Sequence, residues 1–274
     1  MTNKPKITIP ETFMGVQVAG AMERVLAKEK SQEPAKGTAS GSVQPFEFSN
    51  KDINPRDYLQ ISQLNKIISK FELPGYNDMN WQDTHFKLHQ NGIYMPTIPE
   101  FMTHFQNVID SYKSQGKKPL FDAAGNPIDE KEVEDIYLHL TKDHIAAYGN
   151  QKGAWTWLDA MFKKSANGLE IMSEHKTFKD VGGTKTLEPG KIESLEKCIM
   201  KDCYADFNKL NSQGLPTKEL KSEYKQGENI YFWSPISERV ARFVAGSGRA
   251  VLDCDGGPSG RYSGLGVFGV AEGK

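Results

Sequence analysis

Two histidines, His85 and His89, have a spacing that could place both imidazole rings on one metal ion. They lie four residues apart in a stretch that predicts a helix, so both rings would project from the same face. A helical zinc site of the His-Glu-x-x-His type also needs a glutamate between them, and neither residue 86 nor residue 88 is one. The sequence places no third ligand. The pattern therefore favours two surface histidines of a helix over a metal site.

A second set of reactive groups, Asp253, Cys254 and Asp255, lies near the C-terminus. Two carboxylates beside a thiol could support acid–base chemistry, but a general acid needs a pocket that the sequence does not reveal. No phosphate-binding loop, nucleophile elbow or Ser-His-Asp arrangement stands out. The three cysteines are a sparse, odd set that predicts free thiols in a reducing compartment, with a Cys198–Cys203 bridge as the alternative. These residues alone give little support for an enzyme.

The same C-terminal stretch contains the residue types of adaptable recognition loops. Between residues 246 and 264, glycines alternate with Asp, Ser, Arg and Tyr. Glycine relaxes the backbone, while the others supply hydrogen bonds, a planar cation and a rigid aromatic ring. An ordinary glycine-rich surface loop is the alternative, and composition leaves both interpretations open.

Residue types that are missing from this tail are informative as well. From Arg239 to Ala271 there is no Lys, Gln, Glu, Met or Trp, although ordinary glycine-rich loops admit Lys, Glu and Gln. Apolar residues nevertheless recur in the segment, which predicts short core strands joined by permissive loops. The predicted core residues of the tail are Val240, Phe243, Leu252, Leu265 and Val267.

The elements that must position these groups are predicted as helices first and strands later. Capping patterns predict four helices, which begin near Asn54-Pro55, Asn80, Thr97 and Asp129. The first of them would bury Tyr58, Ile61, Leu64, Ile67 and Ile68 on one face. After Gly149, short glycine-punctuated segments with partly alternating apolar residues predict strands. This order predicts an α+β fold.

An appendage is expected before this domain. Residues Gly15 to Lys30 predict an amphipathic helix, and the Ser-, Gly- and Pro-rich segment Ser31 to Pro45 predicts a flexible linker. The predicted organisation is residues 1–45 as N-terminal helix and linker and residues 46–274 as the main domain. The helix would serve packing or oligomerisation, or would dock the chain onto a larger assembly.

Composition excludes several classes of partner. The chain has 34 basic and 35 acidic side chains, so its bulk charge gives no reason to expect a nucleic-acid partner. Its mean hydropathy is -0.57 and no long apolar run occurs, which predicts that it has no membrane span. The N-terminal residues do not read as a signal peptide, so we expect no standard secretion and a cytoplasmic or virion-associated location.

Three motifs, in order, resemble those of the formylglycine-generating-enzyme group, whose fold is a variant of the C-type lectin fold. They are Tyr94-Met-Pro-Thr-Ile-Pro-Glu-Phe, then Gly153-Ala-Trp-Thr-Trp-Leu-Asp, then a tail in which Ala241-Arg-Phe leads through Pro258 to Gly266-Val-Phe. Together they span roughly Trp81 to Val270. The resemblance implies a C-type lectin-like domain, of the formylglycine-generating-enzyme-like variant, with an N-terminal helical appendage.

Two branches of that group have different functions. In the enzymes, catalysis depends on a cysteine pair in the tail, whereas this tail has Cys254 alone. In the variable proteins of diversity-generating retroelements, the same fold displays a C-terminal region that varies by adenine mutagenesis of asparagine-type codons. Such codons cannot yield Lys, Gln, Glu, Met or Trp, the five types missing here. The chain therefore resembles the variable proteins, and among them archaeal or archaeal-virus members.

This second resemblance implies a non-enzymatic binding protein with a variable region at about residues 231–270. We expect no cofactor and assign no metal-ligating residue; calcium-type carboxylate spacing is not evident, and the sequence does not decide whether the fold binds a structural metal. Its partner would be a protein or another cell-surface ligand, with Arg261 and Tyr262 as the main anchors. The solvent-facing, ligand-binding positions would be Val244, Gly246, Gly248, Val251, Asp253, Asp255, Gly256, Gly257, Ser259, Gly260, Arg261, Tyr262 and Ser263.

Two other functions stay open at this point. One is a formylglycine-generating-type oxidase that uses Cys254 as its reactive thiol. The other is a structural or virion assembly protein in which the N-terminal helix docks and the tail only packs. The sequence does not decide the oligomeric state.

Overall fold

The computed structural model describes residues 12–13, 16–17, 43–47, 53–141, 153–246 and 248–273. The chain divides into two compact units, Met1–Ser40 and Gly41–Lys274. In the first unit, β1 (Thr12–Phe13) pairs antiparallel with β2 (Val16–Gln17). The helix predicted from Gly15 is therefore wrong at its start, where β-branched Val16 pairs with Phe13 as a strand. The rest of that predicted helix, and most of the predicted linker, lie outside the described residues.

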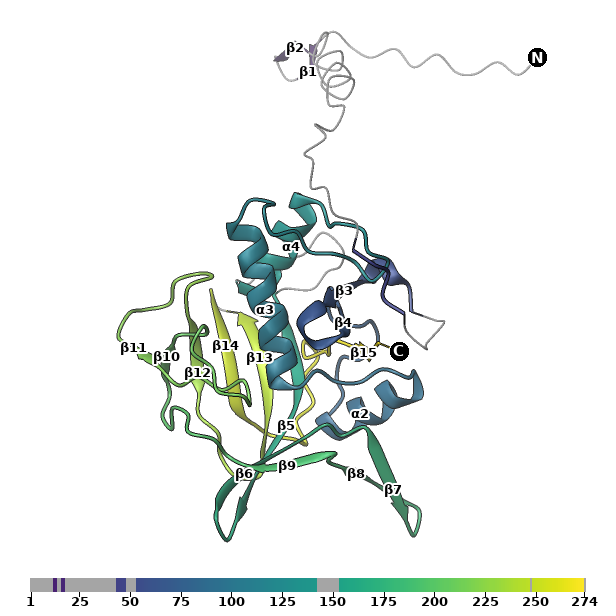
Figure 1. Cartoon of the computed structure of the whole chain (residues 1–274), viewed down its shortest axis with the longest axis vertical. Helices are drawn as coiled ribbons and strands as arrows, with labels where there is room; N and C mark the ends of the chain where they lie inside the picture. The colour runs from purple at the N-terminus through teal and green to yellow at the C-terminus, as the bar shows by residue number, and fades with distance from the viewer. Residues whose placement is uncertain are drawn as a thin grey trace, which may run out of the picture. The chain divides into compact units, whose positions relative to one another are not determined.

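The second unit mixes helices and sheets, which confirms the predicted α+β class (Figure 1). Its helices are α2 (Trp81–Gln90), α3 (Ile98–Lys113) and α4 (Glu130–Thr141). None of the helices in the described part of the chain is long and apolar enough to cross a membrane.

One eight-stranded sheet forms the centre of this unit, and its neighbours are antiparallel except for the parallel pair β12 and β14. In spatial order its strands are β11 (Glu219–Leu220), β10 (Cys203–Ala205), β12 (Ile230–Trp233), β14 (Arg249–Gly256), β13 (Arg239–Gly246), β5 (Trp155–Ser165), β6 (Gly168–Ser173) and β9 (Lys191–Ser194). A separate hairpin is formed by β7 (Thr177–Val181) and β8 (Thr184–Glu188).

Three of the four predicted helix starts are confirmed by their capping contacts. Asn80 accepts a hydrogen bond from the backbone N–H of Asp83 at 2.8 Å and begins α2. A full capping box at the start of α3 joins Thr97 and Glu100 in both directions. Before α4, Asp129 accepts from the N–H of Glu132 at 2.8 Å. These caps satisfy backbone donors that have no partner within the first turn of a helix.

The helix predicted after Asn54-Pro55 is wrong. Asn54 does cap a turn, but it is the short 3₁₀ helix η1 (Pro55–Asp57), and the chain then forms β3 (Tyr58–Ile61) and β4 (Lys66–Ser69). A 3₁₀ turn, η2 (Ser62–Leu64), joins these strands. Antiparallel pairing of β4 with β15 (Val270–Glu272) completes a three-stranded sheet. The pairing between β-branched strands and the chain's last residues outweighs the local helical pattern.

Helix α3 lies across one face of the large sheet, with α4 beside it (Figure 1). The ring of Phe243 on β13 packs against Phe101 and Phe105 of α3, with ring centroids 4.8 and 5.3 Å apart. The predicted core residues of the tail are confirmed, because each of these side chains is fully buried: Val240, Phe243, Leu252, Leu265 and Val267. The tail is thus part of the hydrophobic core and not a loose end.

The three sequence motifs meet in space through backbone hydrogen bonds. The N–H of Asp159 donates to the carbonyl of Pro96 at 2.8 Å, which joins the second motif to the first. Trp155 and Trp157 exchange hydrogen bonds with Gly266 at 2.8 and 3.1 Å, which joins the second motif to the tail. Segments far apart in the sequence therefore form one scaffold around β5.

Candidate ligand-binding face

The tail strands β13 and β14 separate core residues from residues on the opposite face. Phe243 pairs directly with Leu252, and Val244 pairs with Val251. Because successive side chains of a strand point to opposite faces, the first pair lies on the α3 side and the second on the other side. We call this second side the tail face. Its residues on the two strands are Arg242, Val244, Arg249, Val251, Asp253 and Asp255.

At one end of the tail face, an ion pair is framed by two aromatic rings. The Arg242 Nε donates to Asp253 Oδ2 at 2.6 Å, and both side chains are largely buried. The guanidinium lies 5.6 Å from the ring centre of Tyr262, which in turn lies 5.5 Å from the ring of Trp155. Tyr262 is the most exposed of this group, with 38% of its surface accessible. A partner that covered this ring would also cover the charged pair behind it.

At the other end, the strands next to β14 add further aromatic groups. Arg249 lies over the ring of Tyr231 on β12, 4.5 Å from its centre. The Tyr231 ring meets Tyr204 of β10 edge-on, with centroids 5.0 Å apart. The tail face therefore offers two clusters of arginine and aromatic side chains, separated by Val244 and Val251.

Helix α2 and the segment before it hold the loop between β14 and β15 next to this face. The backbone N–H of Trp81 donates to the carbonyl of Pro258 at 3.1 Å, and that of Asp78 donates to the carbonyl of Tyr262 at 3.2 Å. Arg261 forms an ion pair with Asp83 in the first turn of α2. The loop thus has a defined position relative to the sheet, which limits the entropy that it would lose on binding.

The structure places most of the predicted ligand-binding positions at the surface or half-buried beside it. The exposed ones are Gly248, Ser259, Arg261, Tyr262 and Ser263, and the half-buried ones are Val244, Gly246, Asp255, Gly257 and Gly260. They all lie in β13, in β14 or in the loops that follow these strands.

For Val251, Asp253 and Gly256, the expectation of a solvent-facing position is wrong, because all three are buried. On the face of the sheet, the side chain of Val251 lies between its cross-strand neighbours Tyr231 and Val244. Asp253 is enclosed by its bonds to Arg242 and to the N–H of Asp255, the latter at 3.0 Å. A side chain at Gly256 would lie 2.9 Å from the carbonyl of Val240, at a bulge in β13. These three residues support the tail face from within the sheet and are not exposed to a ligand.

Four members of the tail face and its surroundings were missed by the sequence analysis: Arg242, Arg249, Trp155 and Tyr231. The two arginines share the parity of Val244 and Val251, so the strand alternation could have revealed them. The two aromatic residues come from β5 and β12, and only the sheet order brings them to the tail.

One acidic group on this face has a perturbed pKa. Burial, together with the neighbouring Asp253, raises the pKa of Asp255 from 3.8 to about 6. The Asp253 carboxylate accepts the Asp255 N–H and the Arg242 guanidinium, so the two acidic residues lie close together on this face.

Cys254 lies on the opposite side of β14 from the tail face. It is fully buried in the core beside α3, and burial raises the pKa of its thiol well above the usual value. Cys198, Cys203 and Cys254 are all free thiols, so the alternative of a Cys198–Cys203 bridge is wrong. A buried, protonated thiol is a poor nucleophile and a poor metal ligand.

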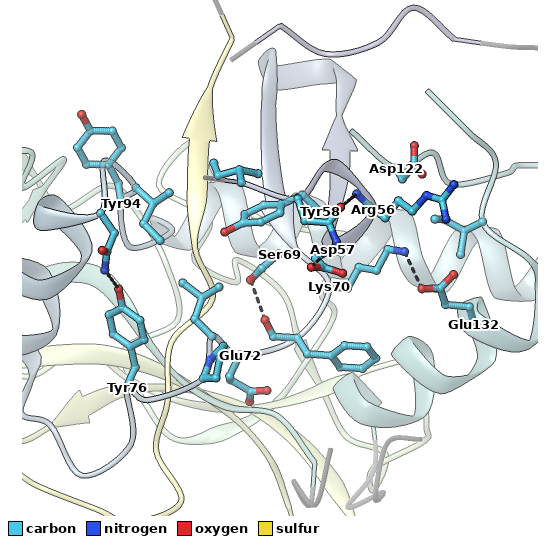
Figure 2. A pocket seen from close by; sticks show the side chains of 18 of the residues that line it. Arg56, Asp57, Tyr58, Ser69, Lys70, Glu72, Tyr76, Tyr94, Asp122 and Glu132 are labelled. Carbon is cyan, nitrogen blue, oxygen red and sulfur yellow. Dashed lines mark hydrogen bonds and ion pairs between the residues drawn. The ribbon is translucent and has the colours of Figure 1, made fainter. Parts of the chain in front are cut away.

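A broad depression of about 1450 Å³ lies elsewhere, where the β3–β4 hairpin faces α4 and the residues after α2 (Figure 2). Its polar groups are largely paired with one another. Lys70 Nζ bonds Glu132 Oε1 at 2.6 Å, and Asn91 donates to the Tyr76 hydroxyl at 2.7 Å. None of the described residues that line it belongs to the tail. It is therefore separate from the tail face.

Comparison with known proteins adds no relative: no protein-family model, no curated protein and no solved structure matches this chain.

Proposed function

We propose that this protein is a ligand-binding display protein with a C-type lectin-like fold, a member of the variable proteins of diversity-generating retroelements. The tail face and its adjoining loop present variable residues to a protein or another surface ligand. The observation that carries this proposal is the alternation along β13 and β14. One side of each strand is buried in the core, whereas the other side holds the half-buried Val244, Arg249 and Asp255 beside the buried Val251 and Asp253.

The alternation explains how a tail can vary without unfolding its own domain. Substitutions at surface positions usually change the free energy of unfolding by less than about 0.5 kcal/mol, whereas core substitutions cost several-fold more. The exposed and half-buried tail positions are of the first kind. The five residue types missing between Arg239 and Ala271 are those that adenine mutagenesis of asparagine-type codons cannot produce.

The chemistry of the tail face favours a protein surface as ligand. Arginine and tyrosine are enriched at the energetic centres of protein interfaces, and both clusters on this face contain them. The apolar residues Val244 and Val251 lie between the clusters. A face of this kind, with arginine and aromatic side chains spread over several strands, suits an extended protein partner better than a small molecule.

The most direct test is genomic. A second copy of the tail's coding sequence near the gene should differ from it only at adenines of the copy, and those codons should fall at the exposed and half-buried tail positions. Differences at other bases, or differences concentrated at Phe243 and Leu252, would contradict the proposal.

A library experiment tests the scaffold itself. One library randomises six positions on or beside the tail face: Val244, Gly246, Asp255, Arg261, Tyr262 and Ser263. The control library randomises six buried positions of the same strands: Ala241, Phe243, Ala245, Ala250, Leu252 and Cys254. We expect most members of the first library to fold on the yeast or phage surface, and binders to unrelated proteins to be selectable from it. Few members of the control library should fold. Equal loss of folding in both libraries would refute the separation of the two faces.

A further inference from the structure

A buried cluster of three metal-binding residue types lies between α2, β5 and the segment after β6. The residues are His85, Asp159 and His175, each no more than 3% exposed. One potential ligand atom from each lies within 4.8 Å of the others. The spacing of His85 and His89 predicted two surface histidines, and that prediction is wrong for His85, which is buried in the protein.

His85 is the most informative member. Only 1% of the surface of His85 is exposed, yet neither of its ring nitrogens has a hydrogen-bond partner among the described residues. Leaving a buried polar atom unsatisfied costs free energy, and such atoms are rare in folded proteins. Asp159 Oδ1 lies 3.6 Å from His85 Nε2, which is too far for a hydrogen bond. A metal ion bound to both atoms would use the free nitrogen.

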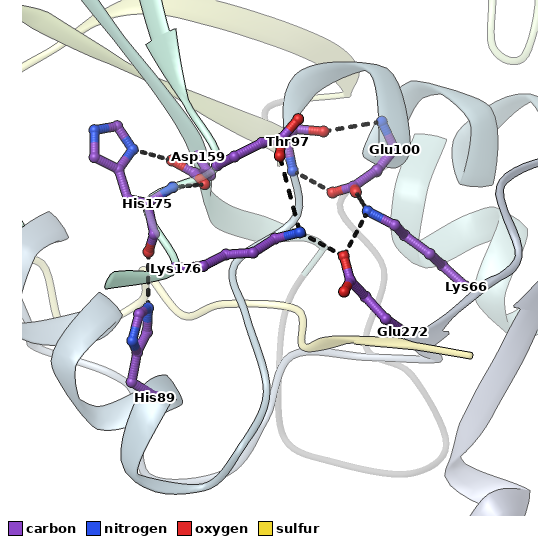
Figure 3. Close-up of polar contacts among 9 residues, drawn as sticks. Lys66, His89, Thr97, Glu100, Asp159, His175, Lys176 and Glu272 are labelled. Atoms are coloured by element: carbon purple, nitrogen blue, oxygen red, sulfur yellow. Dashed lines mark hydrogen bonds and ion pairs between the residues drawn. The ribbon is translucent and has the colours of Figure 1, made fainter. Parts of the chain in front are cut away.

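Asp159 and His175 are held in place beside it (Figure 3). Asp159 Oδ2 accepts the backbone N–H of His175 at 2.9 Å, and Oδ1 lies 2.5 Å from His175 Nδ1. The backbone carbonyl of His175 contacts His89 Nε2 at 2.7 Å. The next residue, Lys176, forms an ion pair with Glu272 of β15. The backbone contacts hold the His175 segment and Asp159 Oδ2 in place, whereas the contact between Asp159 Oδ1 and His175 Nδ1 is the one that an ion would replace.

An aromatic wall completes the surroundings of the cluster. The ring of Trp81 meets His85 and His175 edge-on, with centroids 4.4 and 5.0 Å apart. Its Nε1 donates to the carbonyl of Leu158 at 2.9 Å, so the ring itself is anchored.

We propose that His85, Asp159 and His175 form a site for a divalent transition-metal ion, zinc being the best fit. Two imidazoles and one carboxylate are a ligand set that zinc accepts at about 2.0–2.2 Å, and three protein ligands leave one of its four positions for water. The 3.6 Å between His85 Nε2 and Asp159 Oδ1 matches two ligands of one such ion. An ion bound to both Asp159 Oδ1 and His175 Nδ1 would replace the hydrogen bond between these atoms, and a neutral His175 would then carry its ring proton on Nε2.

The site would tie α2 to the large sheet. The start of α2 holds the loop that bears Arg261 and Tyr262, so the ion would also stiffen that loop. The metal site itself is inferred from the three residues alone and does not depend on the function proposed for the tail face.

The test uses the full-length protein, stripped with a chelator and titrated with Zn²⁺ in a calorimeter. We expect one ion per chain, and a rise in Tm of about 5 °C or more with free zinc at about 100 times its Kd. His85→Gln and His175→Gln should each weaken binding beyond the about 10- to 100-fold that loss of an outer partner of a metal ligand causes. His89→Gln, which removes the contact to the His175 carbonyl, should weaken binding by about 10-fold, less than either ligand variant does. The matched control is Gln90→Ala, a change at an exposed position of the same helix, which should leave the Kd unchanged within about threefold.

A second measurement covers the case in which the variants fail to fold. Co²⁺ added to the stripped wild-type protein should give the intense visible absorption of a four-coordinate nitrogen and oxygen site, and one equivalent of Zn²⁺ should abolish it. The proposal is overturned if the wild-type protein binds no ion with a change in Tm, if its Co²⁺ complex shows only the weak spectrum of the hydrated ion, or if folded His85→Gln protein binds zinc as wild type does.

Discussion

Gly256 and Gly246 end the two tail strands, yet a side chain would meet different surroundings at each. At Gly256, an added Cβ would lie 2.9 Å from the carbonyl oxygen of Val240. Because that oxygen belongs to the backbone, the backbone itself would have to move to relieve the contact. At Gly246 the nearest atom is the Val244 Cγ1, at an ordinary 3.7 Å. We expect Gly256→Ala to lower the free energy of unfolding by about 1–3 kcal/mol and Gly246→Ala to change it by less than about 0.5 kcal/mol. Urea denaturation measures both changes. If Gly256→Ala changed the free energy of unfolding as little as Gly246→Ala does, Gly256 would tolerate a side chain, as the proposed variable positions do.

Asp255 gives the tail face a pH dependence of predictable sign. Its pKa is raised in the folded protein from 3.8 to about 6, so ionising it costs more in the folded than in the unfolded state. Its contribution to stability is therefore lost as pH rises from about 4 to about 6. Asp255→Asn should raise the free energy of unfolding at pH 7.5 by on the order of 1 kcal/mol, once solvent screening of this half-buried group is allowed for. At pH 4 it should have little effect. Urea unfolding at the two pH values decides this, and an equal gain at both would mean that charge is not the cause.

At the scale of elements, the β3–β4 hairpin depends on one left-handed residue. Asn65 has a φ of 50° at the end of η2, where β-branched residues are disfavoured by about 1–2 kcal/mol. Asn65→Val should therefore lower Tm by several degrees, while Asn65→Gly should leave it nearly unchanged. Thermal unfolding followed by circular dichroism compares the two. Equal losses would point instead to the Asn65 side chain, which lies close to Gly273.

This hairpin also shows why part of the fold could not be predicted from the sequence. Helices α2, α3 and α4 were predictable because their caps are local, three residues from donor to acceptor. From Tyr58 to Ile68 the apolar spacing fits a helix, but a turn at Asn65 shifts its phase between two strands. The strand that stabilises the hairpin, β15, lies some 200 residues later, and no local pattern reveals such a partner.

For the candidate site, the sequence predicted the buried core positions of the tail but not the contacts between strands. Strand periodicity identified the core residues Phe243 and Leu252, but the burial of Asp253 depends on Arg242 across the hairpin. A bulge between Val240 and Arg242 shifts the register at that point, so simple alternation along the sequence does not give the cross-strand partners. The cluster of His85, Asp159 and His175 was out of reach for the same reason, since its members come from three elements.

At the scale of the whole molecule, the tail face cannot be separated from the rest of the second unit. The tail supplies two central strands of the large sheet, and β15 pairs with β4 of the other sheet. Glu72 joins these parts, because its carboxylate accepts the N–H of Trp155 at 2.8 Å and contacts His139 of α4 at 2.7 Å. Changes on the tail face therefore act on a rigid frame, which suits a surface whose residues change while its shape is kept.

The division of the chain into two units leads to a prediction about truncation. The second unit begins at Gly41, and its first described residues already contact the rest of the unit. The Gln60 side chain donates to the carbonyl of Gln44 at 3.1 Å, and the backbone of Val43 lies against Gly125. Removing residues 1–40 should leave Tm within about 1 °C of the full-length value. Removing residues 1–45 also deletes Val43 and Gln44, and should lower Tm by about 2–4 °C, the equivalent of roughly 1 kcal/mol.

Light scattering on the same proteins tests whether the first unit has a role in assembly. Such a role would appear as a fall in oligomer mass when residues 1–40 are removed. A loss of stability that is equally large for both truncations would mean that the first unit supports the domain, and would favour a packing role over an independent appendage.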